Sequence, residues 1–255
     1  MEYEYVTTEI EGKVAVLKLR RPPSNLLNIA MMEELNDALM ALRSKAKLQV
    51  VVLRGGDGLF CEGIDLKEHS QKRVQRLIRV FLRIFETMRM MEQISIAAVE
   101  GAAVGGGFEL ALGCNLIVAA DDTRFALPQV RQGIIPPVAT AVLPRIAPRR
   151  RAMEWVLLGD PIDPARLEQD GVVNRLFPAD RFESMLDAFV VALAQRSGPV
   201  LKLARQAQFE AYYTPFPEAL VSIHGLYMKQ LMSLHDAREG PRAVRESRDP
   251  VWKNS

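Results

Sequence analysis

Apolar and polar positions alternate in two different ways along the first half of the chain. Residues 5–20 switch between apolar and polar side chains at every second position and predict two short strands. Continuous apolar runs at residues 50–53 and 94–99 predict buried strands, whereas residues 30–44 and 74–91 repeat apolar side chains at helical spacing. This alternation indicates an α/β fold with parallel strands joined by right-handed crossovers.

The pattern changes beyond Pro128, where helical spacing dominates. Residues 171–176 predict one more short strand in this otherwise helical region. The helices predicted here cover residues 138–143, 151–158, 164–169, 181–195, 200–212, 216–233 and 240–247. We therefore expect two parts: a core over residues 1–195, and a helical region over residues 196–255 that acts as a lid or an oligomerisation arm.

Composition and charge narrow the classes of partner. Of the 255 residues, 49% are hydrophobic, and 33 basic side chains nearly balance 31 acidic ones. A net charge of +2 gives no reason to expect nucleic acid or an anionic membrane as a partner. The two cysteines form no CxxC motif, four glutamates lie among the first eleven residues, and no apolar run is long enough to span a membrane. We therefore predict a cytoplasmic globular protein, either an enzyme or a binding module.

Three consecutive glycines, Gly105–Gly107, follow the strand predicted at residues 94–99 and open a helix that continues to Leu112. Glycine lets the backbone approach a ligand closely, and the start of a helix presents free N–H groups. These features favour an anion, either a phosphate or an oxyanion that forms during a reaction. The segment matches neither G-x-G-x-x-G nor a P-loop. A tight turn without a ligand is the alternative interpretation.

A second glycine site lies after the strand predicted at residues 50–53. Gly63 lets the N–H of the next residue, Ile64, point outward. Two such donors at neighbouring strand ends are what the oxygen of a thioester needs when it becomes negatively charged. Lys67 lies about one turn further on, where its ammonium group suits a phosphate.

The two glycine segments together carry a family resemblance. The sequence reads F-C-x-G-x-D-L-K-E at residues 60–68 and G-x-x-x-G-G-G-x-E-L-A at residues 101–111. With Arg21–Asn25, Phe125–Pro136 and Arg151–Glu154, these motifs make the chain resemble the crotonase superfamily of enoyl-CoA hydratases and isomerases over most of its length. The resemblance implies a ClpP/crotonase-like spiral of repeated ββα units with a helical C-terminal region. It also implies a homotrimer or a homohexamer, with the C-terminal helices at the subunit contacts.

The resemblance implies roles for individual residues. The N–H groups of Ile64 and Gly106 would form an oxyanion hole for the thioester oxygen, and Glu109 would be a general acid or base. The substrate is then an acyl-CoA thioester, with coenzyme A as part of the substrate; neither a permanently bound cofactor nor a metal is expected. The residues implied to contact the acyl group or coenzyme A are Pro23, Leu26, Leu27, Gly63, Lys67, Gly105 and Ile135.

Two positions depart from the family pattern. Hydratases of this kind usually carry a second catalytic glutamate where this chain has Gln129, and glutamine cannot exchange a proton at neutral pH. Gln129 is still able to orient a water molecule or a substrate group. Glu62 occupies a position that is usually small, next to the predicted oxyanion hole. Its carboxylate either replaces the missing catalytic acid or is a solvated loop side chain.

A narrower resemblance concerns the substrate. Lys67–His69, Asn115–Ala120, Leu231–Gly240 and Trp252–Asn254 are similar to cyclohexa-1,5-diene-1-carbonyl-CoA hydratases, which act in the anaerobic degradation of aromatic acids. This resemblance implies a hydratase-type lyase that works through a thioester enolate on a cyclic or otherwise unusual dienoyl-CoA. The alternatives are an enoyl-CoA isomerase or an acyl-CoA decarboxylase, which need fewer carboxylates, and a catalytically silent protein that binds acyl-CoA.

Overall fold

Six strands form a central sheet in which most neighbours are parallel. The computed structural model describes residues 3–255, so Met1 and Glu2 of the acidic N-terminus lie outside the described residues. The sheet has the order β1-β2-β3-β4-β6-β9, in which β1 runs antiparallel to β2 and the other neighbours are parallel. The strands are β1 (Val6–Glu11), β2 (Val14–Leu19), β3 (Val50–Gly55), β4 (Ile94–Val99), β6 (Leu116–Ala120) and β9 (Arg175–Phe177). The predicted α/β class is confirmed.

A second, smaller sheet leads into the triple glycine. It consists of β5 (Ala102–Val104), β7 (Arg124–Ala126) and β8 (Pro161–Ile162); β5 pairs parallel with β7, and β7 pairs antiparallel with β8. The sequence pattern did not predict these strands, because two or three residues are too few to show an alternation of apolar and polar positions. They matter for the site, since β5 ends directly before Gly105.

The strand predicted at residues 171–176 begins later than expected, at Arg175. Gly171 has a φ of 79°, and the N–H groups of Val172 and Val173 both donate to the carbonyl oxygen of Leu167. These residues therefore close the preceding helix. The first part of the prediction is wrong because a helix-terminating turn can carry the same apolar residues as a strand.

Helices connect the strands and form the C-terminal part of the chain. They are α1 (Ile29–Arg43), α2 (Val74–Met90), α3 (Gly106–Leu112), α4 (Pro137–Ile146), α5 (Arg149–Leu158), α6 (Pro164–Gln169), α7 (Phe182–Ala194), α8 (Gly198–Tyr213), α9 (Phe216–Lys229) and α10 (His235–Arg245), with short 3-10 turns at η1 (Leu66–Glu68) and η2 (Pro128–Gln132). The helix predicted from residue 240 starts at His235, because Gly240 and Pro241 lie inside α10. Among residues 3–255, no helix is both long and apolar enough to cross a membrane.

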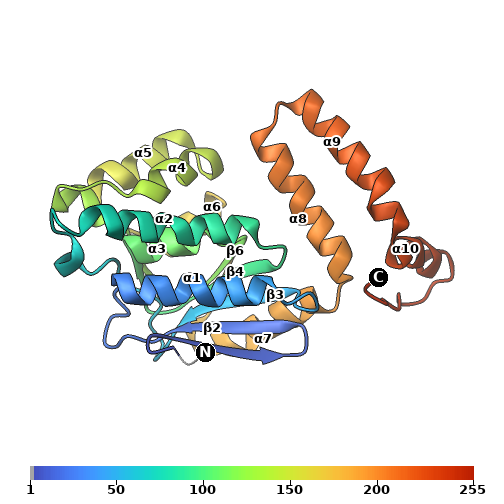
Figure 1. The fold of residues 1–255 in the computed structure, drawn as a ribbon, viewed down its shortest axis with the longest axis horizontal. Coiled ribbons are helices and arrows are strands. Elements are labelled where there is room, and N and C mark those ends of the chain that lie inside the picture. Colours follow the sequence, from blue (N-terminus) through green and yellow to red (C-terminus); the bar gives the residue numbers. More distant parts are fainter. Residues whose placement is uncertain (1–2) are drawn as a thin grey trace.

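The central sheet is covered on both faces, which explains its continuous apolar strands. Figure 1 shows α1, α2 and α3 on one side of the sheet and α7 on the other. Along β3, Val51 and Leu53 pack into the core shared with α1 and α2, whereas Val50 and Val52 pack into the core shared with α7. Because side chains alternate between the two faces, a sheet buried on both sides needs apolar residues at every position.

The helices α8–α10 extend away from the sheets as an arm (Figure 1). The boundary predicted between residues 195 and 196 falls between α7, which ends at Ala194, and α8, which begins at Gly198. The chain end folds back onto this arm, where the carboxylate of Asp236 accepts hydrogen bonds from the N–H groups of Lys253 and Asn254. The C-terminal residues of the chain therefore pack on the start of α10.

Candidate active site

The loop before η1 runs alongside β5 and the start of α3. The N–H of Cys61 donates to the carbonyl oxygen of Ala102 (2.9 Å), and the N–H of Val104 donates to the carbonyl oxygen of Cys61 (3.0 Å). Further along, this parallel arrangement brings Ile64 beside Gly106: a Cβ atom on Gly106 would lie 3.4 Å from the nitrogen of Ile64. The two predicted N–H donors are therefore neighbours.

Both N–H groups are free to bind a ligand. On its other edge the loop pairs with Leu27, whose N–H donates to Gly63 (2.8 Å) and whose carbonyl oxygen accepts from Asp65 (3.0 Å). Successive peptide groups of an extended chain face opposite sides, so the N–H of Ile64 faces away from Leu27. Gly106 is the first residue of α3, where N–H groups have no partner within the helix. Among residues 3–255, neither N–H donates a hydrogen bond to the protein.

Gly105 and Gly107 need to be glycine for different physical reasons. Gly105 has a φ of 52° and a ψ of −122°, a conformation that residues with a Cβ atom rarely adopt. A Cβ atom on Gly107 would overlap the carbonyl oxygen of Cys61. The triple glycine thus lets the start of α3 pack directly against the loop, which holds the N–H of Gly106 beside that of Ile64.

Glu109 lies in the first turn of α3, and its side chain is fully buried. Its Oε1 accepts hydrogen bonds from the N–H groups of Val138 (2.6 Å) and Ala139 (3.0 Å), at the start of α4. The residue at the N-cap position of α4 supplies no side-chain capping bond. Glu109, which is distant in sequence, takes that role and accepts the free N–H groups of the first turn. The Oε2 atom accepts a hydrogen bond from Nε2 of Gln129 (3.0 Å).

The surroundings of Glu109 raise its pKa to about 7. The main cause is burial, which takes the charged form out of water; the hydrogen bonds from Ala139, Val138 and Gln129 act in the opposite direction. The donors to this carboxylate are two backbone amides and one side-chain amide, all of them neutral. A carboxyl group that titrates near neutral pH both accepts and returns a proton, as general acid–base catalysis requires.

A cavity of about 380 Å³ connects these groups. Aliphatic side chains, among them Leu66, Ile78 and Ile134, form much of its wall. The predicted site residues that line it are Leu26, Glu62, Gly63, Ile64, Lys67, Gly105, Gly106, Glu109, Gln129 and Ile135. An apolar wall with a few convergent polar groups is typical of a small-molecule site.

Pro23, Leu27 and Glu62 have surroundings that their sequence positions did not indicate. Pro23 is exposed and lies outside the cavity wall. Leu27 is fully buried, and its backbone holds the loop at Gly63. Glu62 lines the cavity, but its carboxylate forms an ion pair with Arg124 on β7. A catalytic role for Glu62 stays a prediction.

Arg21 and Asp65 fasten the loop to the segment before α1, a contact that was not predicted. The Nη2 atom of Arg21 donates to Oδ2 of Asp65 (2.9 Å), and Nη1 donates to the carbonyl oxygen of Leu26 (2.9 Å). Asn25, with a φ of 49°, donates from Nδ2 to the carbonyl oxygen of Leu59 (2.6 Å). Arg21, Asn25 and Asp65 all lie in the motifs of the sequence, but only the folded chain shows that they hold the loop in place.

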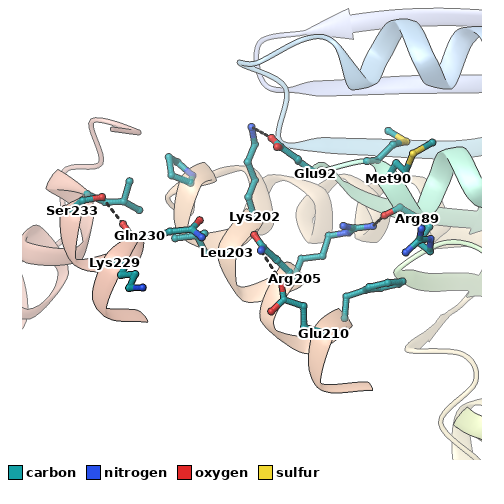
Figure 2. Close-up of a pocket in the computed structure, with 15 residues that line it drawn as sticks. Arg89, Met90, Glu92, Lys202, Leu203, Arg205, Glu210, Lys229, Gln230 and Ser233 are labelled. Atoms are coloured by element: carbon teal, nitrogen blue, oxygen red, sulfur yellow. Dashed lines mark hydrogen bonds and ion pairs between the residues drawn. The ribbon is translucent and has the colours of Figure 1, made fainter. Parts of the chain in front are cut away.

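A larger cavity, of about 720 Å³, lies between the end of α2 and the arm. Figure 2 shows Arg89 and Glu92 on the side of the core, Lys202 and Arg205 on α8, and Lys229 on the side of α9. Several of these charges already have partners: Lys202 pairs with Glu92, and Arg205 donates to backbone carbonyl groups. All the predicted site residues except Pro23 and Leu27 line the smaller cavity, so the candidate active site is there.

Known proteins share both the sequence and the fold of this chain. The family model described as enoyl-CoA hydratase/isomerase matches residues 9–255. A Rhizobium meliloti (strain 1021) protein named "Probable enoyl-CoA hydratase" is 31% identical over 100% of both chains. The mitochondrial enoyl-CoA hydratase of Pongo abelii is 30% identical, covering 99% of this chain and 89% of that protein. The crystal structure of enoyl-CoA hydratase from Bacillus anthracis matches with a TM-score of 0.93 at 27% identity, covering 99% of this chain and 100% of that one, which confirms the implied fold.

Proposed function

Since the chain belongs to the enoyl-CoA hydratase/isomerase family, and is an enzyme of that family, we propose that it adds water to an enoyl-CoA thioester. The observation that carries this proposal is a pair of free N–H groups, those of Ile64 and Gly106, on the wall of the same cavity as the buried carboxyl group of Glu109. The reaction passes through an enolate whose oxygen binds both N–H groups, and Glu109 exchanges the proton.

The N–H pair accounts for the stabilisation of the enolate. Negative charge collects on the thioester oxygen as the double bond reacts, and donors that are already in place bind this charge more strongly than the neutral carbonyl. One such donor contributes roughly 10²–10³-fold in rate. In Glu109, Oε1 already accepts two backbone hydrogen bonds, so Oε2 is the atom that exchanges the proton.

We further propose that the acyl group is cyclic or otherwise a compact dienoyl group. The cavity volume of about 380 Å³ lies near the lower end of ligand pockets. Pro136 and Pro137 stiffen the chain directly after Ile135, so the apolar wall has little freedom to adapt to a long flexible chain. Coenzyme A would occupy the exposed side of the cavity, near Lys67 and Ile135, which is 69% exposed.

Isomerisation of an enoyl-CoA double bond is a second candidate, and one observation favours it. Gln129 occupies the position next to Glu109, and glutamine is neither an acid nor a base at neutral pH. A single carboxyl group suffices to move a proton from one carbon atom to another. Hydration therefore has to be shown by the mass of the product.

Turnover of three thioesters distinguishes these functions. The protein is mixed with crotonyl-CoA, a 3-enoyl-CoA and cyclohexa-1,5-diene-1-carbonyl-CoA, and the product mass and the thioester absorbance are followed. We expect a mass increase of one water with at least one conjugated thioester, and the fastest turnover with the cyclic diene. An unchanged mass with a moved double bond supports isomerisation. Binding of all three without turnover supports a silent acyl-CoA-binding protein and rejects the proposal.

We also propose that further copies of this chain cover the arm in a trimer or a hexamer. The arm leaves large apolar side chains in water, and contiguous exposed apolar surface indicates a protein contact. These side chains are Tyr212, Tyr213, Phe216, Leu220, Val221, Tyr227 and Met228. Light scattering after size-exclusion chromatography is expected to give a trimeric or hexameric mass. Val221→Asp, at a side chain that is 74% exposed, is expected to lower that mass; a wild-type monomer would reject the assembly.

A further inference from the structure

The two free N–H groups of the site are held in different ways. The N–H of Gly106 belongs to the first turn of α3, and the helix fixes its direction. The N–H of Ile64 belongs to the peptide group between Gly63 and Ile64, which is trans. A trans peptide group points its carbonyl oxygen and its N–H in opposite directions. The hydrogen bond from the N–H of Leu27 to the carbonyl oxygen of Gly63 (2.8 Å) therefore decides where this N–H points.

Gly63 permits this orientation of the peptide group but does not hold it. Its φ of 122° is a conformation that residues with a Cβ atom rarely adopt, and glycine also permits the reversed peptide group. Reversal would place the carbonyl oxygen of Gly63 where the N–H of Ile64 lies, and this oxygen would repel an enolate oxygen. The orientation that the chemistry needs therefore depends on contacts outside the loop.

Arg21 joins the two chain segments that meet at this peptide group. Its Nη1 donates to the carbonyl oxygen of Leu26 (2.9 Å), directly before Leu27. Its Nη2 donates to Oδ2 of Asp65 (2.9 Å), directly after Ile64. The N–H of Asp65 donates in turn to the carbonyl oxygen of Leu27 (3.0 Å). One guanidinium group thus bridges both segments beside the hydrogen bonds that orient the N–H of Ile64.

We infer that Arg21 and Asp65 are positioning residues for the N–H of Ile64, an inference that rests on the proposed function. Both carboxylate oxygens of Asp65 already have protein donors, Arg21 and the N–H of Lys67 (3.1 Å), so this side chain supports the loop. Removing the carboxylate loosens the pairing with Leu27 and lets the peptide group turn. Donors that are already in place stabilise the enolate more than the neutral carbonyl, so the loss falls on kcat.

Asp65→Ala tests this role in the hydration assay. We expect kcat to fall about 30-fold with KM near the wild-type value, a smaller loss than the roughly 10²–10³-fold cost of removing a whole donor. Asp65→Asn keeps an acceptor for Arg21 and is expected to restore most of kcat. Arg21→Gln and the double variant are expected to lower kcat about as much as Asp65→Ala, because the two residues act as a unit.

Asp170, at the end of α6, offers a matched control. It pairs with Arg166 at 2.8 Å, its side chain is 6% exposed against 11% for Asp65, and it lies outside the cavity wall. Asp170→Ala is therefore expected to lower Tm, as Asp65→Ala does, but to keep kcat. Arg21→Lys keeps the charge without the fork that reaches both partners, and it provides the same kinetic test if Asp65→Ala does not fold.

The carbonyl stretch of bound butyryl-CoA, with an isotope label at the thioester carbon, measures the donors without turnover. This thioester is saturated, so it has no double bond to hydrate. Two well-aimed N–H groups polarise the carbonyl, so we expect its stretch to move to lower wavenumber on binding to the wild type. The shift is expected to be smaller in Asp65→Ala and unchanged in Asp170→Ala.

The possible results separate this inference from the function on which it rests. Wild-type kcat and a wild-type carbonyl shift in folded Asp65→Ala overturn the positioning role and leave the proposed function standing. A raised KM with unchanged kcat also overturns it, because the pair then contributes to binding of coenzyme A alone. A wild-type protein that hydrates no thioester and does not shift the carbonyl stretch overturns the proposed function itself.

Discussion

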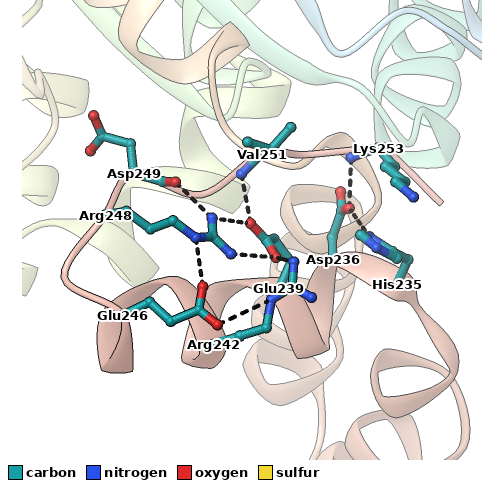
Figure 3. A network of polar contacts seen from close by, with 9 residues as sticks. All are labelled: His235, Asp236, Glu239, Arg242, Glu246, Arg248, Asp249, Val251 and Lys253. Carbon is teal, nitrogen blue, oxygen red and sulfur yellow. Dashed lines mark hydrogen bonds and ion pairs between the residues drawn. The ribbon is translucent and has the colours of Figure 1, made fainter.

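Two buried carboxylates of this chain, Glu109 and Glu239, have opposite pKa shifts. Glu109 is fully buried and Glu239 is 2% exposed, yet the pKa of Glu109 is raised to about 7 and that of Glu239 is lowered to about 2. Burial is the main cause of the raised pKa of Glu109, whereas hydrogen bonds, first that from Arg248, are the main cause of the lowered pKa of Glu239. Glu239 accepts hydrogen bonds from the guanidinium groups of Arg248 and Arg242 and from the N–H of Val251 (Figure 3).

This comparison separates a carboxylate suited to chemistry from one that supports the fold. Neutral amides around Glu109 satisfy its lone pairs without balancing its charge, so its proton stays exchangeable near neutral pH. Guanidinium groups around Glu239 balance the charge and keep the carboxylate ionised over the ordinary pH range. Glu239 ties α10 to the chain end, whereas Glu109 lines the cavity. Burial without a neighbouring cation raises the pKa of Glu109, and guanidinium groups lower that of Glu239, so the surroundings of each carboxylate separate the two roles.

Replacing each carboxylate by its amide is the strongest test of the comparison. Glu109→Gln is expected to lower kcat by about 10³-fold, because an amide cannot accept a proton from water. Glu239→Gln is expected to keep kcat near the wild-type value and to lower Tm by several degrees at neutral pH, because two guanidinium groups lose one of their carboxylate partners and keep only Glu246. Steady-state kinetics and calorimetry on both variants measure these effects. Full activity of Glu109→Gln would reject its role in the proton transfer.

The pH dependence of activity tests whether the pKa of Glu109 is raised. In the proposed hydration the ionised carboxylate of Glu109 accepts the proton of water, so turnover is expected to need a pH above its pKa. We expect kcat/KM to rise about tenfold per pH unit below pH 7 and to level off above it, because the pKa of Glu109 in the free enzyme is about 7. The pH profile is measured in well-buffered solutions of constant ionic strength. A midpoint near 4.5, the ordinary value for glutamate, contradicts the effect of burial.

The pH dependence of stability tests whether the pKa of Glu239 is lowered in the folded chain. Its pKa is lower in the folded chain, so the unfolded chain binds more protons in acid. The stability that Glu239 contributes is present above its ordinary pKa of 4.5 and is lost as the pH falls towards about 2. We expect the Tm values of wild type and Glu239→Gln to differ at neutral pH and to converge in this range. Glu109 has the opposite sign: its ionisation lowers stability as the pH rises through about 7.

Glu62 is a third carboxylate, and the smallest effect is expected there. It lines the cavity, but it is paired with Arg124, whose side chain is 58% exposed. Exposed ion pairs contribute little, so Glu62→Gln is expected to change kcat by less than about fivefold. The same kinetic assay measures this change. A loss as large as that of Glu109→Gln would show instead that Glu62 supplies the second acid of the reaction.

Local patterns were sufficient for the elements with strong periodicity. The strand predicted at residues 94–99 matches β4, and the helix predicted at residues 74–91 ends one residue after α2, because burial of a whole strand or of one helix face requires a regular apolar pattern. The short strands β5, β7 and β8 have no such pattern. Their backbone pairs with distant segments, and that pairing is decided only when the chain folds.

The sequence by itself determined the pair of free N–H groups, and the tertiary structure decided the proton affinity of the carboxyl group beside them. Glycine at positions 63 and 105–107 dictates local backbone geometry, so the free N–H groups of Ile64 and Gly106 were predictable from the chain. The proton affinity of Glu109 was not, because it depends on burial and on donors from α4 and η2 that are distant in sequence. Backbone conformation is a local property of the chain, whereas a pKa is set by every group that the fold brings near.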